Sequence, residues 1–231
     1  MEILGNKVLI ITATFFVYTM SRRLQRRTGI VFLNPILITM FSLIAFLEIT
    51  GISYETYYDA GQYLDFWLKP AIVALGLPLY KQLRPLKKQI LPILASQFAG
   101  CVVGILSAVW VAQLCGASQE VIISLAPKSV TTPIAMEVVE PIGGIPSLTA
   151  AVVICVGLLG ALIGPKTLEI FRIKSPIAQG LSLGTASHAI GTTRAYEFGP
   201  TFGAYSSVGL IVNGIMTAIV TPYLLHLIGM I

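Results

Sequence analysis

Charge is scarce in this sequence. Of its 231 residues only 11% are Asp, Glu, Lys or Arg, whereas 55% are apolar. A soluble globular domain carries roughly 25% charged residues, so a water-exposed surface is excluded for most of the chain. Most residues are therefore expected in lipid. The net charge of +5 does not call for a nucleic-acid partner, because the positions of the cations along the chain explain it better.

Cysteine and the motifs of common enzymes are equally sparse. Cys101, Cys115 and Cys155 lie in or beside apolar runs without metal-ligand spacing, which is typical of small packing residues. The chain has no GxSxG motif, no HExxH pair and no phosphate-binding P-loop. These absences argue against an enzyme, against a bound cofactor or metal, and against nucleotide-driven transport by this chain alone.

The cations that are present fall in three clusters. Segments 22–27, 81–88 and 166–174 together hold 11 of the 15 Lys and Arg residues. Positive charge is retained on the cytoplasmic side of membrane proteins, so all three clusters are expected there. No small-residue cleavage site follows the first apolar run, which predicts a retained first span rather than a signal peptide.

Counting crossings between these clusters predicts a polytopic, all-α membrane protein of the bacterial inner membrane. The polar segment 51–65 fits an external loop. Segments 120–145 and 176–200 must each begin and end on one side, which predicts re-entrant or broken helices, although eight crossings remain the alternative. The six full spans are then 3–21, 29–50, 66–82, 89–115, 147–171 and 203–229.

The two re-entrant segments resemble each other at an offset of about 60 residues. Residues 131–137 read TTPIAME, and residues 192–197 read TTRAYE. Entry from opposite faces indicates an inverted-topology repeat, as in many secondary transporters, although chance similarity of short polar motifs is the alternative. Broken backbone survives at membrane depth only where protein or a water-filled cavity covers it. Two facing breaks therefore predict one central polar site.

This repeat suggests a division within one membrane domain, 1–231. The segment 1–115 is expected to supply scaffold-like helices. The segment 116–231 is expected to carry the repeat, with breaks at 127–133 and 184–194.

The first break, 127–133, has the composition of an anion site. Prolines at both of its ends interrupt the helix and expose N–H groups at the start of a half-helix, which attract anions. Lys128 adds a positive charge, and Ser129, Thr131 and Thr132 can donate hydrogen bonds to a carboxylate. The alternative is that Lys128 extends to the interface and the hydroxyls satisfy a kink. A cation within an apolar run is costly without a use, which favours the anion site.

The second break, 184–194, combines small residues with a further cation. Arg194 can grip a carboxylate with two parallel hydrogen bonds. His188 is a candidate proton carrier or hydrogen-bond donor, or a structural histidine. The substrate-binding candidates in this break are Ser187, His188, Thr192, Thr193 and Arg194.

Acidic residues just beyond the breaks are candidates for ion coupling. Glu137 and Glu197, together with His188, are positioned to link transport to H⁺ or Na⁺. The alternatives are that the two glutamates are loop residues, or that they pair with Lys128 and Arg194.

Four segments carry a resemblance to a known family. Residues 50–54 (TGISY), 69–80, 127–135 (PKSVTTPIA) and 184–189 (GTASHA) resemble the LrgB/CidB family, especially its YohK-type inner-membrane members, over nearly the whole chain. The resemblance implies an antiholin-like role in controlling murein hydrolases. It also implies a small holin-like partner of the LrgA/CidA/YohJ type. Related proteins are linked to pyruvate uptake, and a chloroplast relative moves glycolate and glycerate. Glu137 is not part of the family pattern, which weakens it as a coupling residue.

Two functions follow as expectations. The first is secondary transport of small monocarboxylates of the glycolate, glycerate, lactate or pyruvate type by alternating access. The second is an antiholin-like regulator of murein hydrolase export and lysis that acts with the holin-like partner. A membrane enzyme using Ser187, His188 and Glu197 ranks third, because neighbouring positions do not generally give triad geometry. The expected partners are a small carboxylate, the lipid bilayer, the holin-like protein and further copies of the chain.

Overall fold

The computed structural model describes residues 6–29, 33, 35–67, 70, 80 and 89–231. These residues form helices joined by short connections, with no strand among them. The chain forms two compact units, Met1–Ala74 and Leu75–Ile231, which are described separately below. The second basic cluster, most of the expected span 66–82 and nearly all of the motif 69–80 lie outside the described residues. The division at residues 115 and 116 concerns transport roles and stays a prediction.

The first unit contains helices α1 (Lys7–Thr28), α2 (Pro35–Thr50) and α3 (Tyr54–Asp65). Helix α1 begins where the Asn6 side chain accepts a hydrogen bond from the Val8 N–H at 2.9 Å. It ends at Gly29, whose φ of 66° is the left-handed conformation that favours glycine. Helix α2 is apolar but has 16 residues, fewer than the roughly 20 that cross a bilayer upright.

The segment 51–65, expected as an external loop, is mostly helical, because it contains helix α3. Its external placement stays a prediction. Ser53 starts the helix by accepting a hydrogen bond from the Thr56 N–H at 3.3 Å, and Glu55 complements the positive end of the helix dipole. Lys7 lies 3.9 Å from Asp59 and over the ring of Tyr63, so α3 packs on α1. The charges mark the polar face of a helix, and counting them alone did not distinguish that face from a loop.

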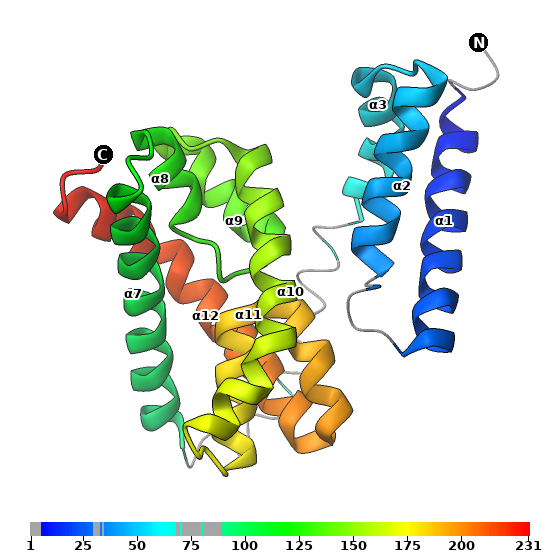
Figure 1. The fold of residues 1–231 in the computed structure, drawn as a ribbon. Helices are drawn as coiled ribbons and strands as arrows, with labels where there is room; N and C mark the ends of the chain where they lie inside the picture. Colours follow the sequence, from blue (N-terminus) through cyan, green and yellow to red (C-terminus); the bar gives the residue numbers. More distant parts are fainter. Residues whose placement is uncertain (1–5, 30–32, 34, 68–69, 71–79, 81–88) are drawn as a thin grey trace. The chain divides into compact units, whose positions relative to one another are not determined.

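The second unit contains three long apolar helices, α7 (Ile90–Leu114), α10 (Pro146–Ile170) and α12 (Pro200–Leu227). Each has the length and composition needed to cross a membrane. In Figure 1, α7 and α12 run in one direction and α10 runs in the opposite direction. Large apolar side chains of α7, including Phe98, Trp110 and Val111, are more than half exposed, as expected for contact with lipid.

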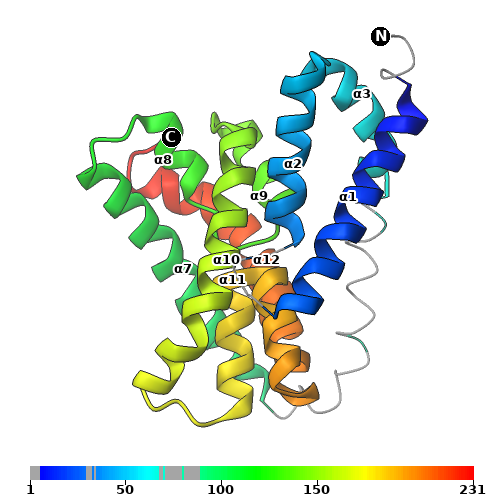
Figure 2. The same cartoon turned by 45° about the vertical axis from the view of Figure 1, so that its right-hand side comes forward.

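The first predicted break joins two short helices, α8 (Gln119–Leu125) and α9 (Thr132–Val139). Residues 126–131 between them are not helical. Helix α9 returns toward the end of the unit from which α8 came, as Figures 1 and 2 show. A short 3₁₀ turn, η1 (Glu140–Ile142), then leads into α10. The segment reverses direction, as predicted for a re-entrant segment.

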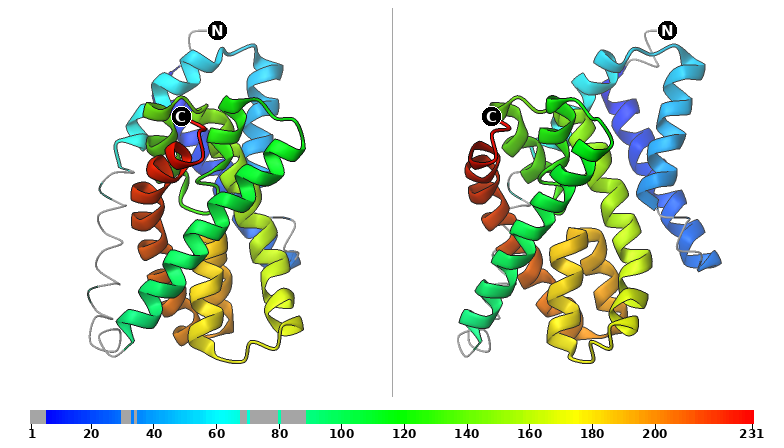
Figure 3. Two further views of the ribbon diagram at one scale, coloured as in Figure 1. Left: turned by 90° about the vertical axis from the view of Figure 1, so that its left-hand side faces the viewer. Right: turned by 60° about the vertical axis from the view of Figure 1, so that its left-hand side comes forward.

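The second predicted break is a single residue within α11 (Pro176–Phe198). His188 has φ 41° and ψ −134°, which turns the chain sharply and separates a first arm from a second arm. The arms fold against each other, because Leu183 and Ala195 lie in one apolar cluster on either side of the turn. Figure 3 shows the two arms side by side, so α11 is a helical hairpin.

The two hairpins confirm the inverted repeat. The hairpin α8–α9 precedes α10, and the hairpin α11 precedes α12. The first enters from the end of the unit where α7 finishes, and the second enters from the end where α7 begins (Figure 1). Each is tied to the helix that follows it. Thr149 of α10 donates to the Ser124 carbonyl at 3.0 Å, and Thr192 is 2.9 Å from the Ser206 hydroxyl of α12.

Candidate functional site

The two breaks approach each other through one residue of α10, Val153. The Val153 side chain packs with Val130 and Ala135 of the first hairpin in a fully buried cluster. Its carbonyl accepts a hydrogen bond from the His188 Nε2 atom at 2.9 Å. The breaks therefore meet at Val153, in the first third of α10, as expected for a site that both hairpins build.

His188 has a structural contact on the side facing α10. The imidazole is 4% exposed, and its bond to a carbonyl places the ring proton on Nε2. The ring lies against Gly157, where a Cβ atom would stand only 2.6 Å from Nε2. The Thr192 hydroxyl donates to the His188 carbonyl at 2.9 Å and so closes the first turn of the second arm. The geometry supports the structural alternative for His188, and its role in coupling stays a prediction.

The other predicted hydroxyls differ in their surroundings. Thr193 is exposed and donates to the Ala189 carbonyl, whereas Thr132 is half-buried at the start of α9. The hydroxyls of Thr131 and Ser187 are buried and have no hydrogen-bond partner among the described residues. A buried hydroxyl without a partner costs about 1–3 kcal/mol, so both atoms have unused capacity to bind a ligand or water.

A groove of about 710 Å³ runs beside the first break. Its walls come from α7, from the first arm of α11 and from the loop between α8 and α9. It follows α7 from Gln89 to Gly104, about 22 Å at 1.5 Å per residue. The polar side chains along it are Gln89, Ser96, Gln97, Lys128, Ser129, Ser175, Ser182 and Thr185.

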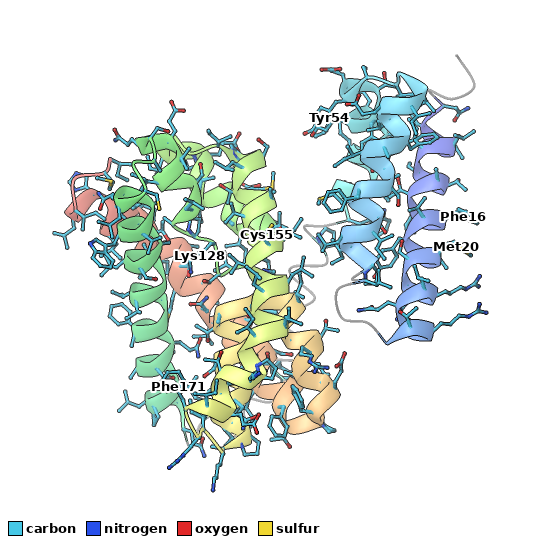
Figure 4. All side chains as sticks on the ribbon, in the orientation of Figure 1. Phe16, Met20, Tyr54, Lys128, Cys155 and Phe171 are labelled. Atoms are coloured by element: carbon cyan, nitrogen blue, oxygen red, sulfur yellow. The ribbon has the colours of Figure 1, made fainter. Side chains whose placement is uncertain are left out.

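Lys128 lies at the break end of this groove, and it is labelled in Figure 4. Its side chain is half-buried, and Nζ donates to the Ser129 hydroxyl at 3.3 Å. No carboxylate among the described residues forms an ion pair with it. The groove therefore contains a positive charge without an ion-pair partner among the described residues, and hydroxyl, amide and apolar groups line the rest of it.

Sequence reasoning missed Gln97 and Thr185, which line the same groove. Gln97 is 2% exposed, and its Oε1 atom accepts a hydrogen bond from the Thr185 hydroxyl at 2.6 Å. Thr185 also receives, at its carbonyl, a hydrogen bond from Asn213 of α12 at 3.2 Å. The available signal for Gln97 was an amide in the interior of the uncharged run 89–115, whose other two glutamines, Gln89 and Gln113, lie near its ends. Only the packing of α7 against α11 shows that it faces the polar groove.

Arg194 lies in a different cavity from Lys128. It pairs with Glu197, and its guanidinium lies 5.0 Å from the centre of the Phe198 ring. The cavity that it lines shares no residue with the groove of Lys128. A substrate held by both cations at once does not fit this arrangement, and a substrate role for Arg194 stays a prediction.

The acidic candidates also lie apart from Lys128. Glu197 forms the ion pair with Arg194 that the sequence left open. Glu137 is exposed on α9 and forms no ion pair with the described residues. Coupling by either glutamate stays a prediction.

These features define an α-helical membrane protein with a pair of inverted helical hairpins around a polar groove. The chain belongs to the LrgB-like family, whose family model matches residues 14–227.

Its relatives extend over almost its full length. The Bacillus subtilis protein YwbG is 40% identical over 92% of this chain and 94% of its own. The Bacillus subtilis protein YxaC is 36% identical over 95% of this chain and 96% of its own. A Staphylococcus aureus protein named holin-like protein CidB is 35% identical with the same coverage. No solved structure matches this chain.

Proposed function

We propose that this protein is a multi-pass secondary transporter of small monocarboxylates in the bacterial inner membrane. The observation that carries the proposal is the unpaired Lys128 ammonium in a polar groove at a helix break. An ammonium group at membrane depth is costly unless an opposite charge accompanies it. Since no carboxylate of the described residues supplies that charge, an anionic substrate is the natural partner.

The groups around Lys128 suit a small 2-hydroxy or 2-oxo acid. Lys128 and Ser129 would bind the carboxylate, and the N-terminus of α9, with its unpaired Thr131 hydroxyl, adds positive potential beside them. Gln97 and Thr185 offer a donor and acceptors for the substituent on the second carbon. Both hairpins would thus contribute to one site through the Val153 contacts.

The groove connects the proposed binding site with one end of the unit, as expected for one of the two conformations in an alternating-access cycle. Its walls run from Lys128 to Gln89 and Ser175, where α7 begins and α11 is about to begin. The basic residues at that end of α10 mark it as cytoplasmic by the positive-inside rule. Movement of the hairpins relative to the long helices would then open the site to the opposite side.

A second function is favoured by the family. Relatives bear the name holin-like protein CidB, so we also consider an antiholin-like regulator that acts with a small holin-like membrane partner. The exposed apolar faces of α7 and α12 would serve as contact surfaces. An unpaired cation in a polar groove contributes nothing to such a surface, which ranks this function second. The two are compatible if the transported acid regulates lysis.

Uptake of labelled pyruvate, lactate and glycolate into proteoliposomes tests the proposal. The wild-type protein should show saturable uptake under an imposed H⁺ or Na⁺ gradient, with or without the holin-like partner. Lys128→Ala should abolish it, and Lys128→Arg should retain part of it, because the charge remains while the geometry changes. Arg23→Ala, which removes an exposed cation from α1, is the matched control.

One outcome would reject the transporter, and another would reject Lys128 as its binding residue. One is the absence of uptake by folded wild-type protein with the partner present, which would favour the lysis regulator. The other is normal uptake by Lys128→Ala, which would place the substrate elsewhere.

A further inference from the structure

A second cavity lies at the end of the unit where α10 finishes and α11 begins. It has a volume of about 680 Å³ and shares no residue with the groove of Lys128. Segments 162–174, 179 and 194–198 contribute to it, so three separate pieces of chain build its walls. Its polar and charged side chains are Lys166, Glu169, Arg172, Lys174, Gln179 and Arg194.

The charge in this cavity is strongly positive. Four cations and one carboxylate, Glu169, line it, and Glu197 outside the lining neutralises one of the cations, Arg194. Lys166, Arg172 and Lys174 form no ion pair with any described residue. Arg194 is held in place by Glu197 and Phe198. Its buried Nε atom has no hydrogen-bond partner among the described residues. The cavity therefore has several unused donors that point to an anionic ligand.

Hydrogen bonds hold the loop that carries Arg172 at both of its ends. The Ile173 N–H bonds to the Leu168 carbonyl and the Arg172 N–H to the Glu169 carbonyl, both at 2.9 Å, which closes the C-terminus of α10. Arg172 has φ 55° at the position where this motif usually has glycine. Gln179 donates to the Ile173 carbonyl at 2.6 Å and fixes the loop to α11.

Helix-dipole stabilisation explains only part of this cluster. Cations after α10 complement the negative end of its dipole, and retention of positive charge on one membrane side adds to the count. Neither effect requires Arg194, which comes from the far arm of α11, or a cavity between the cations. A ligand with several acceptor oxygens explains the whole set, because phosphate oxygens match guanidinium and ammonium donors.

We propose that this cavity binds a phosphate group, as presented by the headgroup of an acidic phospholipid or by a free phosphate ion. Its place at the end of a membrane-crossing helix is where lipid phosphates lie, and basic pockets between such helices bind acidic headgroups. Lys174 precedes the first arm of α11 and Arg194 belongs to the second. A bound phosphate therefore links both arms of the hairpin near its open end.

Thermal unfolding of the purified protein in detergent tests this site without any measurement of transport. The additives are a short-chain phosphatidylglycerol, the matching phosphatidylcholine and inorganic phosphate. The wild-type Tm should rise with phosphatidylglycerol and stay unchanged with phosphatidylcholine. The double variant Arg172→Gln/Lys174→Gln should need about tenfold more phosphatidylglycerol for half of the rise, since each lost cation weakens headgroup binding.

The matched control removes two exposed cations of α1, Arg22→Gln/Arg23→Gln, and should respond like the wild type. If the double variant does not fold, Lys166→Gln replaces it, because Lys166 is an exposed residue of α10 that lines the same cavity. A rise with phosphatidylglycerol alone identifies a lipid headgroup, and a rise with inorganic phosphate as well identifies a free anion site. Equal shifts with both lipids, or in both double variants, would overturn the proposal.

Discussion

Lys128 shows how a charge is placed where the backbone itself is irregular. Residues 126–131 are not helical, so their peptide groups need partners other than the next helical turn. The loop is held by Val130, which is fully buried against α10. Lys128, two residues before it in the same loop, lines the groove. Lys128 is thus unfavourable for the stability of an apolar segment, and it is also the strongest evidence for the proposed function.

Gln97 gives a prediction at the same scale. Gln97→Leu should keep the fold, because leucine has a similar size and the single Thr185 hydroxyl proton, now shared between Gln97 and the Leu181 carbonyl, can go to that carbonyl alone. Loss of one hydrogen bond to the substrate, worth about 0.5–1.5 kcal/mol, should raise KM several-fold and lower the maximal rate little. Concentration-dependent uptake in proteoliposomes measures both. Gln113→Leu, at an exposed position of the same helix, is the control, and equal KM values for the two variants would contradict the role of Gln97.

At the scale of elements, close packing holds the α11 hairpin against α10. The His188 ring and the Ser187 side chain lie on Gly157 and Gly160 of α10. Glycine is required at these two positions because any Cβ atom would enter space that the hairpin occupies. The strained backbone of His188 is stabilised by the contacts of its ring with Val153 and of its carbonyl with the Thr192 hydroxyl.

Gly157→Ala should therefore destabilise the protein. The new methyl group would stand 2.6 Å from the His188 ring, and overpacking of this kind costs about 1–3 kcal/mol. Its Tm, measured by thermal unfolding in detergent, should fall by several degrees. Gly104→Ala is the matched control in α7, since its Cβ would meet the nearest atom at an ordinary 3.9 Å. A fall of the same size in both variants would show that helix glycines matter for a reason other than this contact.

At the scale of the whole molecule, the inverted repeat makes opposite ends of the second unit equivalent. The hairpin α8–α9 occupies one end and the hairpin α11 the other (Figures 1 and 3). Such an arrangement lets two related conformations expose the site to opposite sides in turn, because each hairpin can take the role of the other. The repeat thus connects the fold with the proposed transport cycle.

The topology gives a prediction for intact cells or oriented vesicles. Cys115 is exposed at the end of α7, so with Cys101 and Cys155 replaced by alanine a membrane-impermeant maleimide should label it from the outside only. Thr201→Cys in a background without the native cysteines should be labelled from the cytoplasmic side only, because it begins α12 at the opposite end. Labelling of both positions from the same side would refute the opposite placement of the two ends.

The sequence alone determined the class of protein and the places where its helices break. Hydropathy and charge are local properties of composition, and prolines at 127 and 133 act on the backbone beside them. The sequence was therefore sufficient to predict long apolar helices, two reversals of chain direction and an inverted repeat. The polar composition of residues 51–65 predicted a loop, but most of this segment is a helix with a polar face.

Only the tertiary structure decided which polar residues share a cavity. Lys128 and Arg194 carry the same charge and belong to the two re-entrant segments, yet one lies in the groove beside α7 and the other in the basic cavity at the end of α10. Gln97 lines the groove from α7, a helix that contains none of the sequence motifs. Such groupings depend on how helices distant in sequence pack and rotate against each other, and no single segment of the chain encodes that arrangement.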